Sequence, residues 1–101
     1  MTTSKVEINV PDAIRVKVTD EVIIVDLSDG RTVSAPLAWY PRLVRATARE
    51  RANWRMIGKG EGIHWTDLDE DVSVEGLLAG RPSGESPASF KRWLAARSKR
   101  A

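Results

Sequence analysis

Apolar and polar positions alternate in the first third of the chain. Over residues 13–18, Ile14, Val16 and Val18 alternate with two basic residues, which is the two-residue period of a half-buried strand. Residues 22–27 (VIIVDL) are β-branched and almost continuously apolar, which predicts a strand buried on both faces. Residues 1–11 have no clear period and predict a frayed lead-in or an edge strand.

Turn residues join these strands into a meander. Asp29 and Gly30 form the pair that supplies a positive φ in a tight hairpin, and residues 32–35 return as a third strand that ends at Pro36. Two consecutive hairpins predict a three-stranded antiparallel sheet.

The next segment has helical signals. Pro41 suits the first turn of a helix, and Tyr40, Leu43 and Val44 share one helical face. The run TARE, residues 47–50, matches a capping box. These signals predict two short helices that meet near residue 47, or one bent helix. We expect Trp54 to anchor the second helical turn to the core.

Residues 56–80 predict less regular structure. Residues 56–62 hold three alternating glycines and predict a loop or an irregular strand start. Residues 67–71 form an acidic turn, residues 72–74 alternate as a further strand, and residues 74–80 can close as a helical turn that ends at a glycine.

Residues 81–87 have the composition of a linker, and the chain ends in an amphipathic helix. Ser86 and Pro87 supply the cap and the first helical position. The apolar stripe and basic face of this helix contain Phe90, Trp93, Leu94 and Arg97. The sequence therefore predicts one α+β domain over residues 1–83, followed by a helix and basic tail over residues 84–101.

Composition limits the class of protein. The 101 residues suit one domain, and 42% hydrophobic with 30% charged residues is typical of a globular chain. The chain has no cysteine, which excludes disulfides and thiolate chemistry. The first sixteen residues lack an apolar signal-peptide core, and no stretch reaches the length of a membrane helix. We expect a soluble, cytoplasmic protein.

The net charge is only +2, but it is arranged in blocks. Residues 40–60 contain six basic residues and one acid, residues 61–75 contain six acids and no Lys or Arg, and the last eleven residues contain five basic residues. Such a dipolar surface affects the choice of partner more than the fold.

Catalytic and metal-binding patterns are weak. His64 lies three residues before Asp67 and could form a base with it, but a lone histidine beside apolar residues is more often packed in the structure. Asp67, Asp69 and Asp71 match the first ligands of a calcium loop, yet Val72 stands where that loop needs glycine. We therefore expect no enzyme, no metal site and no cofactor.

Two surfaces remain as candidates for binding. One, for a protein partner, is either the acidic turn, with Asp67, Asp69 and Asp71, or the terminal helix, with Phe90, Trp93, Leu94 and Arg97. The other, for nucleic acid, is the arginine-rich segment with Arg42, Arg45, Arg49 and Arg55. The adjacent acidic block would repel phosphate, which ranks nucleic acid second.

The runs DGRTVSAPLAWYPRL (residues 29–43) and ATARERANWRMIGKGEGIHWTDLDEDVSVEGLLAGRPS (residues 46–83) resemble the small bacterial domain-of-unknown-function family 2442. The resemblance covers residues 13 to about 83 and leaves the terminal helix outside. It implies a compact α+β domain without established enzymatic activity. The recurrent residues of the family imply turn and packing positions, namely Asp29, Gly30, Pro36, Trp54, Gly62, His64, Trp65, Asp69 and Glu70.

Some members of that family carry a helix-turn-helix domain, and others are encoded beside a second small protein, as in toxin–antitoxin pairs. This chain has no helix-turn-helix after residue 83. The leading hypothesis is therefore a non-enzymatic interaction module, the antitoxin-like partner of a small toxin. The alternative is a nucleic-acid-binding regulator that uses the arginine-rich segment. The same surfaces would also permit oligomerisation.

Overall fold

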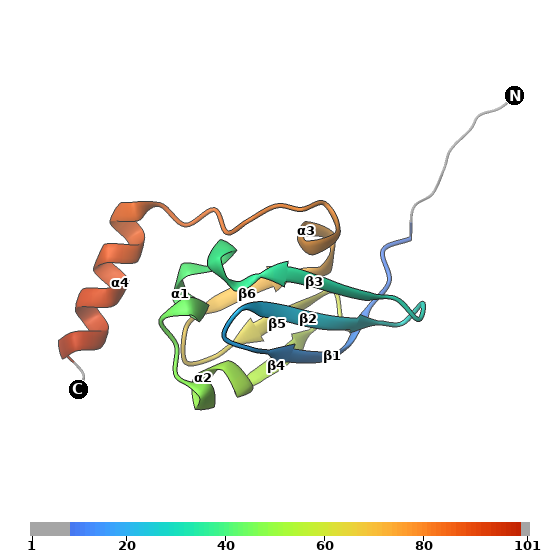
Figure 1. Ribbon diagram of the computed structural model, residues 1–101, viewed down its shortest axis with the longest axis horizontal. Helices are drawn as coiled ribbons and strands as arrows, with labels where there is room; N and C mark the ends of the chain where they lie inside the picture. The colour runs from blue at the N-terminus through green and yellow to red at the C-terminus, as the bar shows by residue number, and fades with distance from the viewer. Residues whose placement is uncertain (1–8, 100–101) are drawn as a thin grey trace, which may run out of the picture.

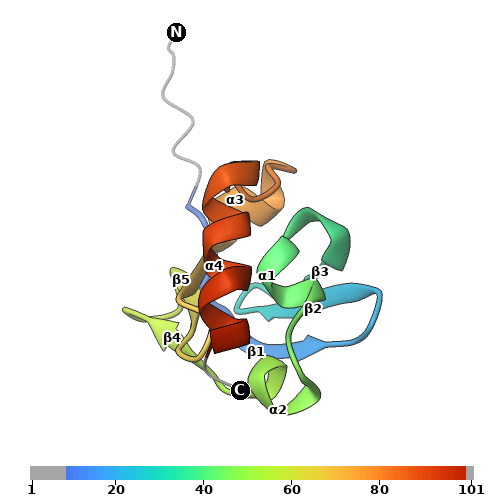
Figure 2. The same ribbon diagram turned by 90° about the vertical axis from the view of Figure 1, so that its left-hand side faces the viewer.

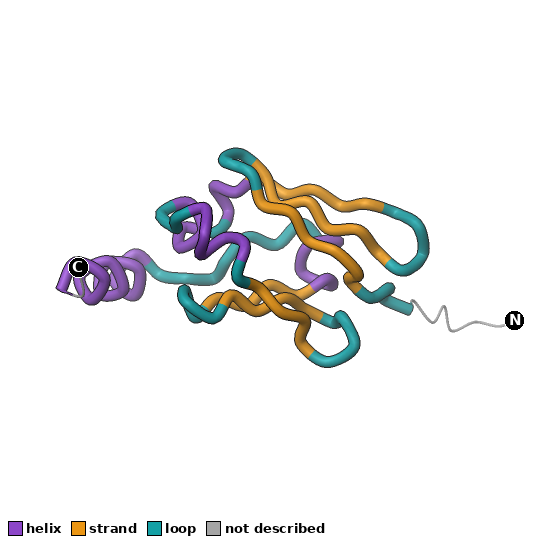
Figure 3. The backbone as a smooth tube through the Cα atoms, turned by 90° about the horizontal axis from the view of Figure 1, so that it is seen from below, coloured by secondary structure: helices purple, strands orange, loops and turns teal. Residues whose placement is uncertain are grey.

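Two three-stranded antiparallel sheets stack face to face in the computed structural model, which describes residues 9–99 (Figures 1 and 3). The first sheet contains β1 (Ala13–Val18), β2 (Val22–Leu27) and β3 (Thr32–Pro36), and the second contains β4 (Trp54–Ile57), β5 (Gly62–Trp65) and β6 (Glu70–Ser73). In both sheets the strands lie side by side in chain order.

Short helices connect and flank the sheets. A 3₁₀ turn (Leu37–Trp39), α1 (Pro41–Val44) and α2 (Ala48–Ala52) link the two sheets, and α3 (Val74–Leu78) follows β6. The longest helix, α4 (Pro87–Lys99), lies beside one end of the sheet pair, as Figures 1 and 2 show. None of the helices within residues 9–99 combines the length and apolar character needed to cross a bilayer.

The core fills the space between the sheets. Ile23 and Val25 of β2 face Ile63 and Trp65 of β5, and all four side chains are inaccessible to solvent. Leu37, Leu43, Leu68 and Val74 close the margins of this core. Burial of such large apolar side chains is the main stabilising contribution in a domain of this size.

The α+β class and the β1–β2–β3 meander are confirmed, but the second sheet has three strands where the sequence predicted one. Residues 54–57 form β4, although Trp54 was expected to anchor a helical turn; its side chain packs against the core from the strand instead. Asn53 terminates α2, and its backbone leaves the helical region at φ −94° and ψ 73°. Pairing with β5 then holds Trp54 opposite Trp65.

The predicted burial of two strands is partly wrong. Ile14 is 60% exposed, because the β1–β2 register shifts between Ala13 and Arg15. This irregularity lets Ala13 and Val16 both face the core while Ile14 faces outward. In β2, Ile23, Val25 and Leu27 are buried but the alternate residues are only half-buried, so one face of the strand is covered.

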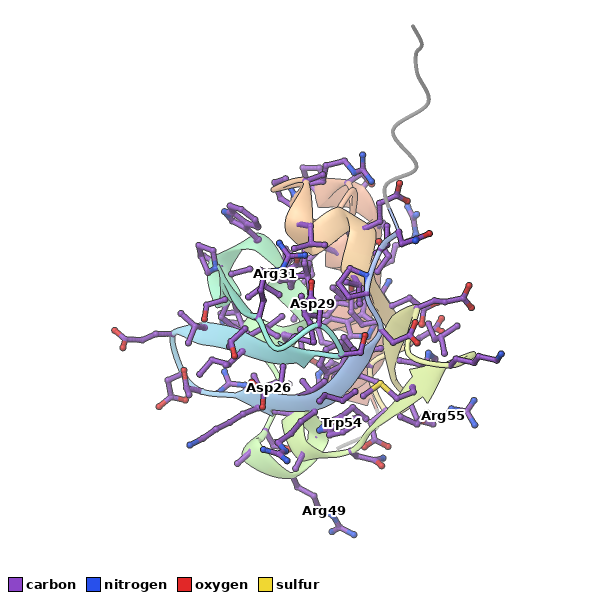
Figure 4. The ribbon with its side chains drawn as sticks, turned by 90° about the vertical axis from the view of Figure 1, so that its right-hand side faces the viewer. Asp26, Asp29, Arg31, Arg49, Trp54 and Arg55 are labelled. Atoms are coloured by element: carbon purple, nitrogen blue, oxygen red, sulfur yellow. The ribbon has the colours of Figure 1, made fainter. Side chains whose placement is uncertain are left out.

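The local turn and cap signals are confirmed. Gly30 adopts φ +92° in the β2–β3 hairpin, near which Asp26, Asp29 and Arg31 lie (Figure 4). The hydroxyl of Thr47 accepts from the backbone N–H of Glu50, whose carboxylate accepts in return from Thr47 N–H. The chain therefore forms two short helices. Val44 leaves the predicted shared face and is 43% exposed.

The helical turn and the terminal cap also form where they were expected, and α3 is followed by Gly80 at φ +71°. The acidic turn is shorter than predicted, because Glu70 and Asp71 already belong to β6, which ends at Ser73. Ser86 accepts from the backbone N–H of Ser89 at the start of α4. Most of the predicted lead-in at residues 1–11 and the end of the basic tail lie outside the described residues.

Candidate partner-binding site

Trp93 attaches α4 to the rest of the chain. The guanidinium carbon of Arg42 in α1 lies 5.3 Å from the centre of its ring, and Trp93 also packs against the margin of the core. Within α4, Arg97 lies 4.6 Å from the same ring centre and Phe90 stacks on the ring at 5.8 Å between ring centres. A cation–π contact such as that of Arg42 stabilises an interface whose side chains are only partly buried.

An ion pair fixes the second half of α4 to α2. Arg97 Nη1 and Nη2 donate to Oε2 and Oε1 of Glu50 at 3.0 and 2.9 Å. This hydrogen bonding, together with the N–H of Thr47, lowers the pKa of Glu50 to about 2, although partial burial opposes the shift. Glu50 therefore both caps α2 and holds α4.

A second ion pair holds the linker before α4. Arg42 Nη2 donates to Glu85 Oε2 at 2.7 Å, and its Nη1 donates to the carbonyl oxygens of Leu68 and Asp69 at 2.8 and 3.3 Å. Ser89 in α4 also donates to Glu85, at 2.8 Å. The hydrogen bonds from Arg42 are the main reason that the pKa of Glu85 lies below its usual value.

Two grooves open along α4. The first, of about 740 Å³, lies between α4 and α2 and is lined by Val44, Arg45, Glu50, Asp67, Leu94, Arg97 and Ser98. The second, of about 560 Å³, lies between α4 and the β5–β6 turn and is lined by Arg42, Thr66, Asp67, Leu68, Asp69, Ser89, Arg92 and Trp93. We call these the α2 groove and the turn groove.

The structure brings most of the predicted partner-binding residues together. Asp67 and Asp69 come from the β5–β6 turn and reach the same grooves as Trp93, Leu94 and Arg97. Asp71 does not join them, because it pairs across the sheet with His64. The sequence suggested the acidic turn and the terminal helix as separate candidates, and their proximity follows from the packing of α4.

The predicted arginine-rich face is divided. Arg42 is held by Glu85 and Trp93, whereas Arg45, Arg49 and Arg55 are exposed and form no ion pair among residues 9–99. Arg49, at the bottom of the view, and Arg55, at its right, point away from the body in different directions (Figure 4). The four arginines therefore do not form one continuous surface.

His64 does not pair with Asp67, the partner that a catalytic role would need. Asp67 accepts from the Asn53 amide at 2.9 Å, whereas His64 Nδ1 lies 2.5 Å from Asp71 Oδ1. The register of β5 and β6 places His64 and Asp71 opposite each other on the outer face of the second sheet. Within residues 9–99, no three His, Cys, Asp or Glu side chains are grouped as metal ligands would be.

One buried carboxylate was missed by the sequence reasoning. Glu70 is 9% exposed, and burial is the main reason that its pKa rises to about 7. Burial, with a contribution from Glu70, also raises the pKa of Tyr40, whose hydroxyl is buried without a hydrogen-bond partner among the described residues. Its burial could have been inferred from the two-residue spacing between Glu70 and Val72, which places both side chains on the inner face of β6.

Comparison with known proteins places this geometry in a family. The model of the family described as "Protein of unknown function (DUF2442)" matches residues 13–83, so α4 lies outside the match. A protein of unknown function from Rhodospirillum rubrum is 32% identical, with 79% of this chain and 96% of that chain covered and a TM-score of 0.66.

An uncharacterized protein from Chromobacterium violaceum, solved by NMR, is 25% identical, with 85% of this chain and 75% of that chain covered and a TM-score of 0.61. No curated protein matches the chain.

Proposed function

We infer, from the premise that this chain belongs to the DUF2442 family of proteins of unknown function, that it is a non-enzymatic protein-interaction module whose partner binds along α4. The observation that supports this proposal is the meeting of two sequence-distant segments, the acidic turn and α4, around the two grooves. Grooves that combine apolar and charged side chains are typical of protein interfaces.

The side chains of the grooves define the chemistry of the partner. Val44 and Leu94 supply an apolar contact in the α2 groove, and Val44 is 43% exposed. Asp67 and Asp69 are exposed in the turn groove. A complementary segment presents an apolar side chain to Val44 and a basic side chain to the two aspartates. A small basic protein, such as the toxin of a toxin–antitoxin pair, meets this description.

The first experiment is capture of the partner with the tagged chain from nuclease-treated lysate of the native host, followed by calorimetry with the purified partner. Leu94→Asp and the double variant Asp67→Asn/Asp69→Asn should each weaken binding by about tenfold or more, since each removes one contact of the partner. Ile14→Asp is the matched control, because Ile14 is exposed at the start of β1 and lies outside both grooves. Equal binding by all variants would refute the site.

Nucleic-acid binding is the second candidate function. It is supported by the exposed side chains of Arg49 and Arg55, which form no ion pair within residues 9–99, and by Trp54, which lines a third groove of about 430 Å³. Binding through phosphates would fall steeply with salt. Fluorescence anisotropy with labelled single- and double-stranded oligonucleotides at low and high salt tests it. The absence of binding at low salt would remove this candidate.

A further inference from the structure

A further pocket, separate from the grooves described above, lies beside the linker that leads to α4. A pocket of about 240 Å³ is enclosed by Tyr40, by Glu70 and its neighbours in β6, by Gly76 of α3, and by residues 81–84 of the linker. It shares no lining residue with the α2 groove or the turn groove. A ligand of this pocket would therefore not compete with a partner on α4 for the same lining residues.

Two polar groups in the pocket lack partners. The Tyr40 side chain is 3% exposed and its hydroxyl forms no hydrogen bond within the described part of the chain. Glu70 is 9% exposed, and no side-chain hydrogen bond or ion pair to its carboxylate forms within residues 9–99, although its oxygens, unlike the Tyr40 hydroxyl, keep some contact with solvent. A buried polar group without a partner costs free energy, so a pocket that combines one with a largely buried carboxylate is suited to a ligand that binds both.

The charge around the pocket gives the sign of that ligand. The positive charge of Arg42 lowers the pKa of Glu70, but the N–H groups of Arg42 are already bound by Glu85 and by two carbonyl oxygens. The negative charges of Glu85, Asp71 and Asp69 raise the pKa of Glu70. Arg81 lines the pocket but is an exposed residue. An ionised Glu70 therefore has the charge of Arg42 in its vicinity, but no hydrogen-bond donor of its own among the side chains of residues 9–99.

We propose that this pocket binds a primary ammonium group, with the Glu70 carboxylate as its counter-ion and the Tyr40 hydroxyl as its second polar contact. A primary ammonium group is compact and carries three N–H donors, and a tyrosine hydroxyl can accept as well as donate. Such a group occurs both in free alkylamines and at the end of a lysine side chain. The experiment distinguishes these two sources.

The proposal implies a pH dependence. Other charged groups around Glu70 are Arg42, Glu85, Asp69 and Asp71, and Arg81 lines the same pocket. Because the pKa of Glu70 is raised to about 7, a proton competes with the ammonium group below that pH. Affinity should therefore fall by up to about tenfold for each pH unit below 7 and level off above pH 8.

The test is an NMR titration of the ¹⁵N-labelled full chain with n-butylammonium at pH 8. We expect saturable shifts in the amide signals of Tyr40, Glu70 and residues 81–84. Tetramethylammonium is the matched control, since it has the same charge but no N–H donor, and it should leave these signals unchanged. Equal shifts with both cations, or no shifts with either, would overturn the proposal.

Variants separate a specific site from general electrostatics. Glu70→Gln keeps the shape of the side chain and should abolish butylammonium binding, and Tyr40→Phe should weaken it by about fivefold through the loss of one hydrogen bond. Glu75→Gln removes a nearby exposed acid that does not line the pocket and should bind like the wild type. Unchanged binding by both pocket variants would contradict the assignment.

Two further ligands identify the source of the ammonium group. N-acetyl-lysine-N-methylamide presents it on a lysine side chain, and 1,4-diaminobutane presents it on a free amine. Stronger binding of the lysine derivative assigns the pocket to a lysine of a protein, whereas stronger binding of the diamine assigns it to a free amine. Binding of neither, at concentrations where butylammonium saturates, would refute a biological ammonium site.

Discussion

Arg42 and Glu85 form a two-pronged ion pair in which Nε and Nη2 of the guanidinium group donate to both carboxylate oxygens, at 2.7 to 3.0 Å. The two residues are 43 positions apart in the sequence, and Glu85 lies just beyond the segment that the family model matches. The pair therefore connects the family domain to the linker that carries α4.

Arg42→Lys should lower the free energy of unfolding by about 2 kcal/mol. An ammonium group cannot reproduce the paired bonds to Glu85 together with the bonds to two carbonyl oxygens, and it leaves a carboxylate with 7% side-chain exposure poorly paired. Urea denaturation followed by far-ultraviolet circular dichroism measures this loss.

The matched control for that substitution is Arg31→Lys. Arg31 pairs with Asp29 in the β2–β3 hairpin, but both side chains are largely exposed, at 61% and 41%. Exposed ion pairs add little to stability, so this variant should unfold at the same urea concentration as the wild type. A similar loss in both variants would show that the Arg42–Glu85 pair contributes no more to the free energy of unfolding than the exposed pair.

Acid should release α4 from α2. The pKa of Glu50 is about 2 in the fold against an ordinary value of 4.5, so its pairing with Arg97 stabilises the fold fully above pH 4.5. That contribution is lost as the pH falls from 4.5 towards 2. The indole N–H signal of Trp93 in NMR spectra should shift over this range.

Glu50→Gln is the control for the acid titration. Glutamine keeps the capping box of α2 but removes the charge that binds Arg97. In this variant the Trp93 signal should be displaced at pH 7 and change little between pH 4.5 and 2. An unaltered transition in the variant would assign the acid effect to another carboxyl group.

Glu70, in contrast to Glu50, should make the fold less stable as the pH rises. Its pKa is about 7 in the fold against 4.5 in the unfolded chain, so between these values the fold keeps a proton that the unfolded chain has lost. Stability therefore decreases as pH rises from 4.5 to 7, by about 3 kcal/mol in total. Glu70→Gln should remove this decrease and raise the urea midpoint at pH 8. A variant that is less stable at pH 8 would contradict it.

Gly60→Ala should destabilise the fold by at least about 2 kcal/mol, because Gly60 has φ +112° and a Cβ there would lie 2.5 Å from the carbonyl oxygen of Ala13. The same backbone contact includes a hydrogen bond from Ala13 N–H to Gly60 O at 2.7 Å. Gly30→Ala is the control, since φ is +92° there but the space is open, and it should cost about 1 kcal/mol. Thermal unfolding of both variants tests the difference.

The sequence predicted those parts of the fold that depend on neighbouring residues. The Asp29–Gly30 turn and the Thr47–Glu50 box act over two to four positions, and both form as expected. β4 was missed because its four residues, WRMI, are short and lie between a helix and a glycine-rich turn. Pairing with β5, which no local pattern reveals, makes them a strand.

The candidate site could be predicted only in part, because its contacts join distant segments. The apolar residues of α4 and the acids of the β5–β6 turn were both recognisable in the sequence as candidate binding residues. Their meeting depends on Arg42, Glu85, Glu50 and Arg97, whose pairings span 43 and 47 positions. Glu70 was hidden within a run of acids that suggested a solvated turn, and its burial follows from its place on the inner face of β6.

The order of the strands has a consequence for how the chain folds. Each strand pairs only with its neighbour in the sequence, so each sheet is a pair of consecutive hairpins that close over short loops. Hairpins of this kind form on the microsecond scale, whereas contacts between distant segments carry the larger entropic cost. The slow step of folding should therefore be the docking of two preformed sheets, in which Trp65 and Ile23 become enclosed. Substitutions at this interface should slow folding more than those in the hairpin turns.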